Sequence, residues 1–97
     1  MSPALIVRTT RRFDRLARSL RKQHPGAFTD QFETALAILA TDPHNRSGHH
    51  PIRKLQGVAE GKGQYRLRLG RWRFRYDILG DDVVLHTAGL RREDTYR

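Results

Sequence analysis

The chain has 97 residues, with 19 Lys and Arg against 10 Asp and Glu and a formal net charge of +9. This length supports one hydrophobic core, so residues 1–97 are expected to form a single domain. The absence of cysteine excludes a disulfide framework and a thiolate metal site and fits a reducing cytoplasm. No apolar run approaches the roughly 18 residues of a membrane span, and the N-terminus lacks the pattern of a secretory signal.

The basic residues are mostly arginine, sixteen against three lysines. Arginine makes planar, bidentate contacts with phosphate, so this bias favours a polyanionic partner such as nucleic acid. A soluble basic protein from an arginine-rich proteome stays open on composition alone. The charge is uneven, because residues 1–22 carry a net +6, residues 23–45 carry −3 and residues 46–97 carry +6.

The first part of the chain predicts a strand and a helix. Ala4–Thr9 is a short β-branched apolar run that reads as a strand, and Thr9 or Thr10 can cap the helix that follows. In that helix the apolar residues recur at helical spacing, at Phe13, Leu16, Ala17 and Leu20.

A second helix is expected after the break at His24–Gly26. Its apolar residues run at helical spacing from Phe28 to Leu39, Asp30 with Glu33 forms a capping box, and Pro43 ends it. The short Pro-Gly connection predicts that the two helices form an antiparallel hairpin.

The second half predicts strands. Thr41–Pro51 is a polar loop, Ile52–Gly57 an extended segment, Gln64–Leu79 a β-hairpin turning at Gly70-Arg71, and Val83–Leu90 a central strand. The order β-α-α-β-β-β predicts an α+β fold in which a small, mainly antiparallel sheet packs against the helical hairpin.

The hairpin register places like charges opposite one another. With a two-residue turn, Arg68 lies opposite Arg73 and Arg66 opposite Arg75, while the aromatic and aliphatic residues between them face the helices. Each like-charge pair is unfavourable by a few tenths to about 1 kcal/mol, and a bound polyanion would reverse that sign. Arginine is also common on a solvated strand face, so a purely structural role stays open for each residue taken singly.

The histidines and the tail give weaker signals. His44, His49 and His50 share a loop without partners at zinc-ligand spacing, so no metal site is expected. His86 is expected to share a face with Val84 and Ala88, looking either inward or toward the arginines. Tyr96 can stack on a base, take part in proton transfer, or anchor the chain end.

The chain resembles the RelE/ParE superfamily of bacterial toxin–antitoxin toxins. The resemblance covers most of the chain and is most specific in four ordered motifs: Leu55 with Gly57, the Tyr-Arg-x-Arg-x-Gly run Tyr65–Gly70, the strand Trp72–Tyr76, and Gly89–Arg91 followed by Tyr96. It implies a RelE-like fold.

The same resemblance implies the toxin of a type II system, an endoribonuclease that cleaves mRNA on the ribosome and inhibits translation. The RNA 2′-OH attacks the adjacent phosphate without a metal or other cofactor. By resemblance, the catalytic residues are Arg73, Arg91 and Tyr96. The expected phosphate-binding residues are Lys54, Arg66, Arg68, Arg75 and Arg92.

The chain departs from the best-known ribosome-dependent members, which have lysines where Arg66 and Arg68 stand. Arginine stays protonated and is a poor general base, so Tyr96 or His86 is expected to carry the proton. Two alternatives stay open: a ParE-like toxin that inhibits DNA gyrase without cleaving RNA, and a nucleic-acid-binding module without activity.

The resemblance also implies partners. A cognate antitoxin is expected to lay an acidic or amphipathic segment over the sheet or against the helices. The mRNA and the ribosome are the other expected partners, in the cytoplasm and away from any membrane.

Overall fold

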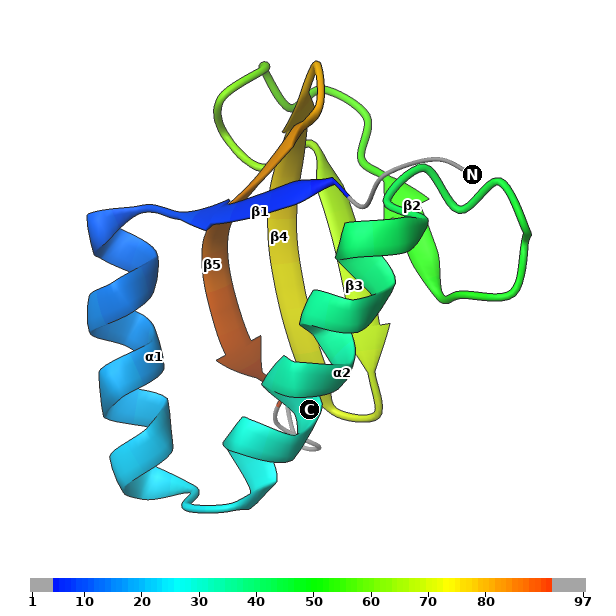
Figure 1. Cartoon of the computed structure of the whole chain (residues 1–97). Coiled ribbons are helices and arrows are strands. Elements are labelled where there is room, and N and C mark those ends of the chain that lie inside the picture. Colours follow the sequence, from blue (N-terminus) through cyan, green and yellow to red (C-terminus); the bar gives the residue numbers. More distant parts are fainter. Residues whose placement is uncertain (1–4, 92–97) are drawn as a thin grey trace, which may run out of the picture.

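Five strands and two helices form two layers in the computed structural model, which describes residues 5–91 of the chain (Figure 1). In chain order the elements are β1 (Ile6–Thr9), α1 (Arg11–Gln23), α2 (Ala27–Thr41), β2 (Ile52–Lys54), β3 (Tyr65–Leu69), β4 (Trp72–Leu79) and β5 (Asp82–Leu90). The strand order in the sheet is β1-β5-β4-β3-β2, with β1 parallel to β5 and the other pairs antiparallel. The predicted α+β fold is confirmed, and the extended segment at Ile52 supplies a fifth strand, β2, at the sheet edge.

The start of α1 follows the predicted capping chemistry. Thr10 is the N-cap, and its hydroxyl accepts a hydrogen bond of 3.0 Å from the backbone N–H of Phe13. Phe13 and Ala17 are buried, so one stripe of the helix packs on the sheet while the rest faces solvent.

The start of α2 differs from the prediction. The helix begins at Ala27, with Gly26 as N-cap at φ +80° and no side-chain cap. Asp30 therefore lies inside the first turn, where its N–H bonds the Gly26 carbonyl at 2.9 Å, and it is not a capping residue. The Pro-Gly connection allowed this earlier start because glycine accepts the left-handed backbone that the turn requires.

The β3–β4 hairpin has the predicted register. Leu69 lies opposite Trp72 and Leu67 opposite Phe74, and Gly70 takes a φ of +62° at the turn. Leu67, Trp72 and Phe74 belong to the buried core together with Phe13 and Phe28 of the helices. The apolar side of the hairpin is therefore the side that α1 and α2 cover.

The strand β5 lies inside the sheet, between β1 and β4, as its apolar composition predicted. Val83 and Leu85 are fully buried on the helix side. The middle position of the sheet belongs to β4.

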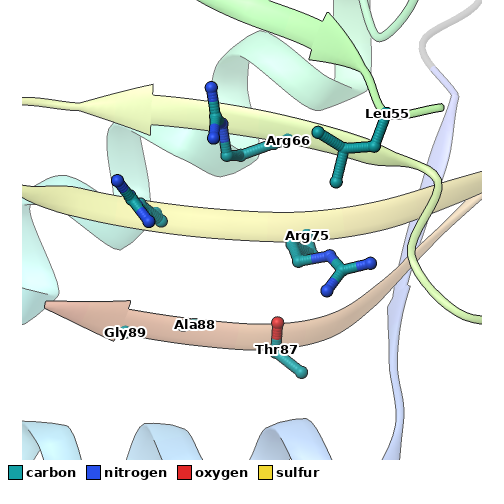
Figure 2. A pocket seen from close by; sticks show the side chains of 7 residues that line it. Leu55, Arg66, Arg75, Thr87, Ala88 and Gly89 are labelled. Carbon is teal, nitrogen blue, oxygen red and sulfur yellow. The ribbon is translucent and has the colours of Figure 1, made fainter. Parts of the chain in front are cut away.

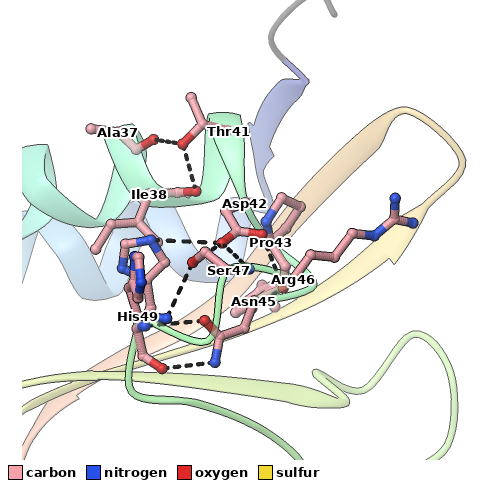
Figure 3. A network of polar contacts seen from close by, with 11 residues as sticks. Ala37, Ile38, Thr41, Asp42, Pro43, Asn45, Arg46, Ser47 and His49 are labelled. Carbon is pink, nitrogen blue, oxygen red and sulfur yellow. Dashed lines mark hydrogen bonds and ion pairs between the residues drawn. The ribbon is translucent and has the colours of Figure 1, made fainter.

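A network of hydrogen bonds links residues within the α2–β2 connection (Figure 3). Asp42 accepts hydrogen bonds from the backbone N–H groups of Arg46 and Ser47 and from the Ser47 hydroxyl, at 2.7 to 3.2 Å. The Ser47 hydroxyl is the main cause that holds the pKa of Asp42 below its ordinary value. These hydrogen bonds hold the loop in place, although it has no regular secondary structure.

This loop is tied to the core by one buried hydrogen bond. The Tyr76 hydroxyl donates to the carbonyl oxygen of Pro43 at 2.7 Å, across 33 residues of sequence. Burial raises the pKa of Tyr76 far above its ordinary value, with smaller contributions from Tyr65 and Asp42. This shift keeps the phenol protonated, and so a hydrogen-bond donor, at neutral pH.

Neither helix within residues 5–91 is long and apolar enough to cross a membrane.

We expect Tyr76→Phe to lower the free energy of unfolding by about 1 kcal/mol, because the buried Pro43 carbonyl loses its donor. Urea unfolding followed by circular dichroism measures the shift of the midpoint. Tyr65→Phe is the matched control. The Tyr65 ring stacks on the Tyr76 ring with 5.4 Å between their centres, but its hydroxyl forms no hydrogen bond with another residue in the range 5–91. Equal midpoint shifts in the two variants would contradict this role of the bond.

Candidate nucleic-acid interface on the arginine face

The side of the sheet that the helices leave uncovered carries five arginines from three adjacent strands. We call it the arginine face: Arg53 of β2, Arg66 and Arg68 of β3, and Arg73 and Arg75 of β4. Arg68 lies opposite Arg73 and Arg66 opposite Arg75, as the hairpin register predicted. Cross-strand side chains lie about 5 Å apart at Cβ, so the guanidinium groups form a dense positive field.

A pocket of about 310 Å³ opens on this face (Figure 2). Arg66, Arg75 and Thr87 come from three neighbouring strands, and Arg73 and Leu55 also line the pocket. Ala88 and Gly89 of β5 complete the lining and carry little side-chain volume. The small residues on β5 leave room for a ligand next to the guanidinium groups.

One donor of Arg73 in this pocket is left without an acceptor within residues 5–91. Its Nε is buried and has no hydrogen-bond partner among the described residues. A buried donor without an acceptor is unfavourable by roughly 1–3 kcal/mol, more when it is charged. An anion in the pocket would supply the missing acceptor.

The arginines also disfavour one another's charge. Burial lowers the pKa of Arg66 below its ordinary value, and the nearby charges of Arg73, Arg68, Arg53 and Arg91 lower it further. This places Arg91, at the end of β5, within electrostatic reach of Arg66. The site is preorganised for negative charge, because binding an anion relieves the repulsion.

Arg75 makes specific contacts within the protein. Its guanidinium donates to the Gly63 carbonyl at 2.9 and 3.1 Å and to the Lys62 carbonyl at 3.1 Å. Gly63 has a φ of +82°, and a Cβ there would lie 3.1 Å from the Arg75 Cβ, so the close approach requires glycine. Arg75, predicted as a phosphate ligand, lines the pocket. Its guanidinium also holds the loop before β3 in place through these hydrogen bonds.

Asp77 lies next to Arg75 on the same side of β4 and is fully buried. Its carboxylate accepts hydrogen bonds from the N–H groups of Gly63 and Gln64 at 2.9 and 3.0 Å, and the Nε2 of His86 lies 2.6 Å away. Burial by itself would raise the pKa of Asp77, but the two N–H groups and the His86 charge outweigh burial and hold the pKa below its ordinary value.

The position of His86 corrects the strand alternation expected from the sequence. Arg75 lies opposite Thr87 but Tyr76 lies opposite Leu85, so His86 is an extra residue in a β-bulge. The bulge separates His86 from Ala88, which packs in the core, and His86 contacts Asp77 instead. Its Nε2 is directed at the Asp77 carboxylate, and Nδ1 is the ring nitrogen that does not face it.

Lys54, predicted as a phosphate ligand, lies on the other side of the sheet. It pairs with Tyr65, and its ammonium sits 5.6 Å from the centre of that ring. Arg53 pairs with Arg66 and takes the place on the arginine face. The sequence alone could have predicted this placement of Arg53. Side chains alternate along a strand, so a core-facing Ile52 puts Arg53 on the outer side.

The last predicted residues fall at the end of the described chain. The backbone of Arg91 bonds that of Arg71, with the Arg91 N–H 2.7 Å from the Arg71 carbonyl oxygen, beside the hairpin turn. Arg92 and Tyr96 lie outside the described residues. Within residues 5–91 no group of three His, Asp or Glu side chains is placed to hold a metal ion.

Comparison with solved structures identifies the architecture. The chain is similar to YafQ of E. coli in the DinJ–YafQ toxin–antitoxin complex, with a TM-score of 0.68 and 12% identity, covering 90% of this chain and 92% of that one. It is also similar to the archaeal RelE–RelB complex from Pyrococcus horikoshii, with a TM-score of 0.67, 21% identity and coverage of 93% and 98%. The fold is that of RelE.

E. coli YafQ crystallised by itself matches the RelE-like fold of this chain as well, with a TM-score of 0.60 and 16% identity over 87% of this chain and 90% of that one. No family model matches the sequence, and no curated protein sequence does. The overall fold implied by the sequence motifs is therefore confirmed by shape, at identities too low to transfer function.

We expect Asp77→Asn to lower the free energy of unfolding by about 2 kcal/mol at neutral pH, because charged hydrogen bonds to two N–H groups are lost. Since the pKa of Asp77 is lowered in the folded state, its contribution is present above pH 3.8 and is lost as the pH falls through the folded-state pKa. The difference between wild type and variant should therefore shrink in acid.

Chemical unfolding at a series of pH values measures this difference. Asp81→Asn is the matched control, because Asp81 is exposed in the β4–β5 turn, and its effect should stay within about 0.5 kcal/mol. A difference between wild type and Asp77→Asn that does not change with pH would argue against a stabilising carboxylate.

Proposed function

We propose that this protein is the toxin of a type II toxin–antitoxin system and cleaves mRNA as an endoribonuclease. The observation that carries the proposal is the pocket on the arginine face, where Arg73 holds a buried Nε without a partner beside Arg66 and Arg75. A phosphodiester provides what the pocket lacks, an anionic acceptor at the centre of opposed positive charges. The RelE-like fold and the sequence motifs support the same class of substrate.

The proposed chemistry is attack of the RNA 2′-OH on the adjacent phosphate, which gives a cyclic phosphate and a free 5′-OH. Negative charge builds up on the phosphate oxygens as the new bond forms. Arg73 and Arg66 stabilise that charge through hydrogen bonds that strengthen in the transition state. Arg91 adds positive charge from the end of β5.

Proton transfer needs a group that the arginines do not supply, because a guanidinium stays protonated at neutral pH. His86 is the described residue that fits. Its Nε2 is held by the buried Asp77, its side chain keeps 21% of its surface accessible, and its neighbour Thr87 lines the pocket. Tyr96 remains the other proposed proton carrier.

The proposed partners are an antitoxin that covers the basic surface and the ribosome that presents the mRNA. YafQ and RelE were crystallised in toxin–antitoxin complexes. An acidic or amphipathic antitoxin segment would complement the net charge of +9.

We expect Arg73→Ala to reduce cleavage on the order of 10²- to 10³-fold, the loss typical of removing one preorganised donor from an anionic transition state. Purified protein is incubated with a defined mRNA, with and without programmed ribosomes, and the cuts are mapped by primer extension. Arg46→Ala is the control, because Arg46 is exposed in the α2–β2 connection and does not line the pocket.

Other outcomes of this cleavage assay would favour the gyrase inhibitor or the binding module instead. Cuts that persist unchanged in Arg73→Ala, or none at all with wild type, would reject the proposed site. In the second case a gyrase supercoiling assay tests the ParE-like alternative. RNA binding without cleavage, and equal loss of binding in all variants of the arginine face, would identify a binding module.

Arg53 and Lys54 offer a second test, because they carry the same charge on one strand but on opposite sides of the sheet. If single-stranded RNA crosses the arginine face, Arg53→Ala should weaken binding on the order of fivefold to tenfold at 0.1 M salt, and Lys54→Ala should change it less than twofold. Fluorescence anisotropy with a 2′-O-methylated oligonucleotide measures both. A larger loss of RNA affinity in Lys54→Ala than in Arg53→Ala would instead indicate that Lys54 is the phosphate ligand.

A further inference from the structure

A second basic surface lies on α1, in the arginine-rich N-terminal segment. The sequence motifs led us to expect no functional site there. On a helix with 3.6 residues per turn, Arg11, Arg15, Arg18 and Lys22 project within about 60° of one another and extend over about 16 Å. We call these four residues the α1 stripe. All four are exposed, while Phe13 and Ala17 on the opposite side of the helix are buried against the sheet.

The α1 stripe and the arginine face point away from each other. The helix packs its buried side on the core side of the sheet, chiefly along β5. The arginines of β2–β4 alternate with core-facing residues and so occupy the other side. A single extended RNA strand in the pocket therefore does not account for the stripe.

The charged side chains of the α1 stripe have no polar partner among the described residues. None of its four side chains forms an ion pair or hydrogen bond with another residue in the range 5–91. The acidic neighbour on the helix, Asp14, accepts a hydrogen bond of 2.7 Å from the Thr9 hydroxyl. Four exposed like charges on one rigid stripe repel one another until a polyanion binds.

The composition of the stripe distinguishes between polyanionic partners. Protein interfaces have an apolar or aromatic core that is depleted in charge, and the stripe has no apolar residue. Single-stranded nucleic acid is usually held by aromatic side chains that stack on bases, and the one aromatic residue of α1, Phe13, is 1% exposed. A duplex backbone needs only regularly spaced positive charge, because double-stranded RNA is recognised through its shape and phosphates.

We infer that the α1 stripe is a docking surface for the phosphate backbone of folded, double-stranded RNA, separate from the pocket that takes the strand to be cut. This inference rests on the proposed function for its biological role, since it lets one molecule hold its substrate and a neighbouring structured RNA at the same time. The binding itself requires only the stripe.

The test uses the full chain and a fluorescent, 2′-O-methylated RNA hairpin with a stem of about 16 base pairs, which cannot undergo 2′-OH attack. The stripe variant is Arg15→Gln with Arg18→Gln, and the control is Arg12→Gln with Arg46→Gln, which removes the same two charges from exposed positions outside the stripe. Glutamine preserves helix propensity, and thermal unfolding verifies that both variants fold.

We expect the stripe variant to bind the hairpin on the order of tenfold or more weakly at 0.1 M salt, with the slope of log K against log salt reduced by roughly one for each lost contact. The control variant should bind like wild type within about threefold. Equal weakening in both variants would show that net charge alone drives binding and would overturn the inference. Unchanged binding in the stripe variant would also overturn it.

The two proposals fail separately. If the stripe variant loses hairpin binding while wild type cuts no mRNA, the docking surface stands and the nuclease does not. If Arg73→Ala abolishes cutting while the stripe variant binds the hairpin like wild type, the nuclease stands and the docking surface does not. Arg73→Ala itself should bind the hairpin normally, because the pocket lies on the other side of the sheet.

Discussion

The register of the β3–β4 hairpin is the constraint on which the rest of this structure depends. Successive side chains alternate between the two sides of the sheet, so one register buries Leu67, Trp72 and Phe74 and turns Arg66, Arg68 and Arg73 outward. A slip of one residue would bury the arginines. Burial of the aromatic side fixes the pairing firmly enough to hold like charges opposite one another, which the arginines by themselves would not allow.

Asp77 connects this sheet to the loop that precedes β3. The buried carboxylate binds two backbone N–H groups of the loop and faces His86, while Arg75 binds two loop carbonyls from the same strand. Donors and acceptors of one loop are thus satisfied by two residues on the same side of β4, and the pocket gains a fixed wall. This explains why a strand so rich in arginine also carries one buried acid.

The two basic surfaces divide the positive charge between two physical settings. On the arginine face the guanidinium groups are partly buried around a pocket, where electrostatic interactions are strong and shape limits the ligand. On α1 the charges are exposed and evenly spaced, where salt screens them and a long, regular polyanion is the better partner. Along the sequence, the acidic segment that contains α2 separates the two basic segments that supply these surfaces.

The sequence by itself determined the elements whose causes are local. Alternation and the Gly70 turn specified the hairpin, the Thr10 cap and apolar spacing specified α1, and together they placed Arg66, Arg68 and Arg73 on one side. Only the tertiary structure decided which of these charges have partners, because the loop that binds Arg75 and Asp77 lies 12 to 14 residues away in sequence. It also decided that a bulge turns His86 toward Asp77, since the pairing of β5 with β4 sets the bulge.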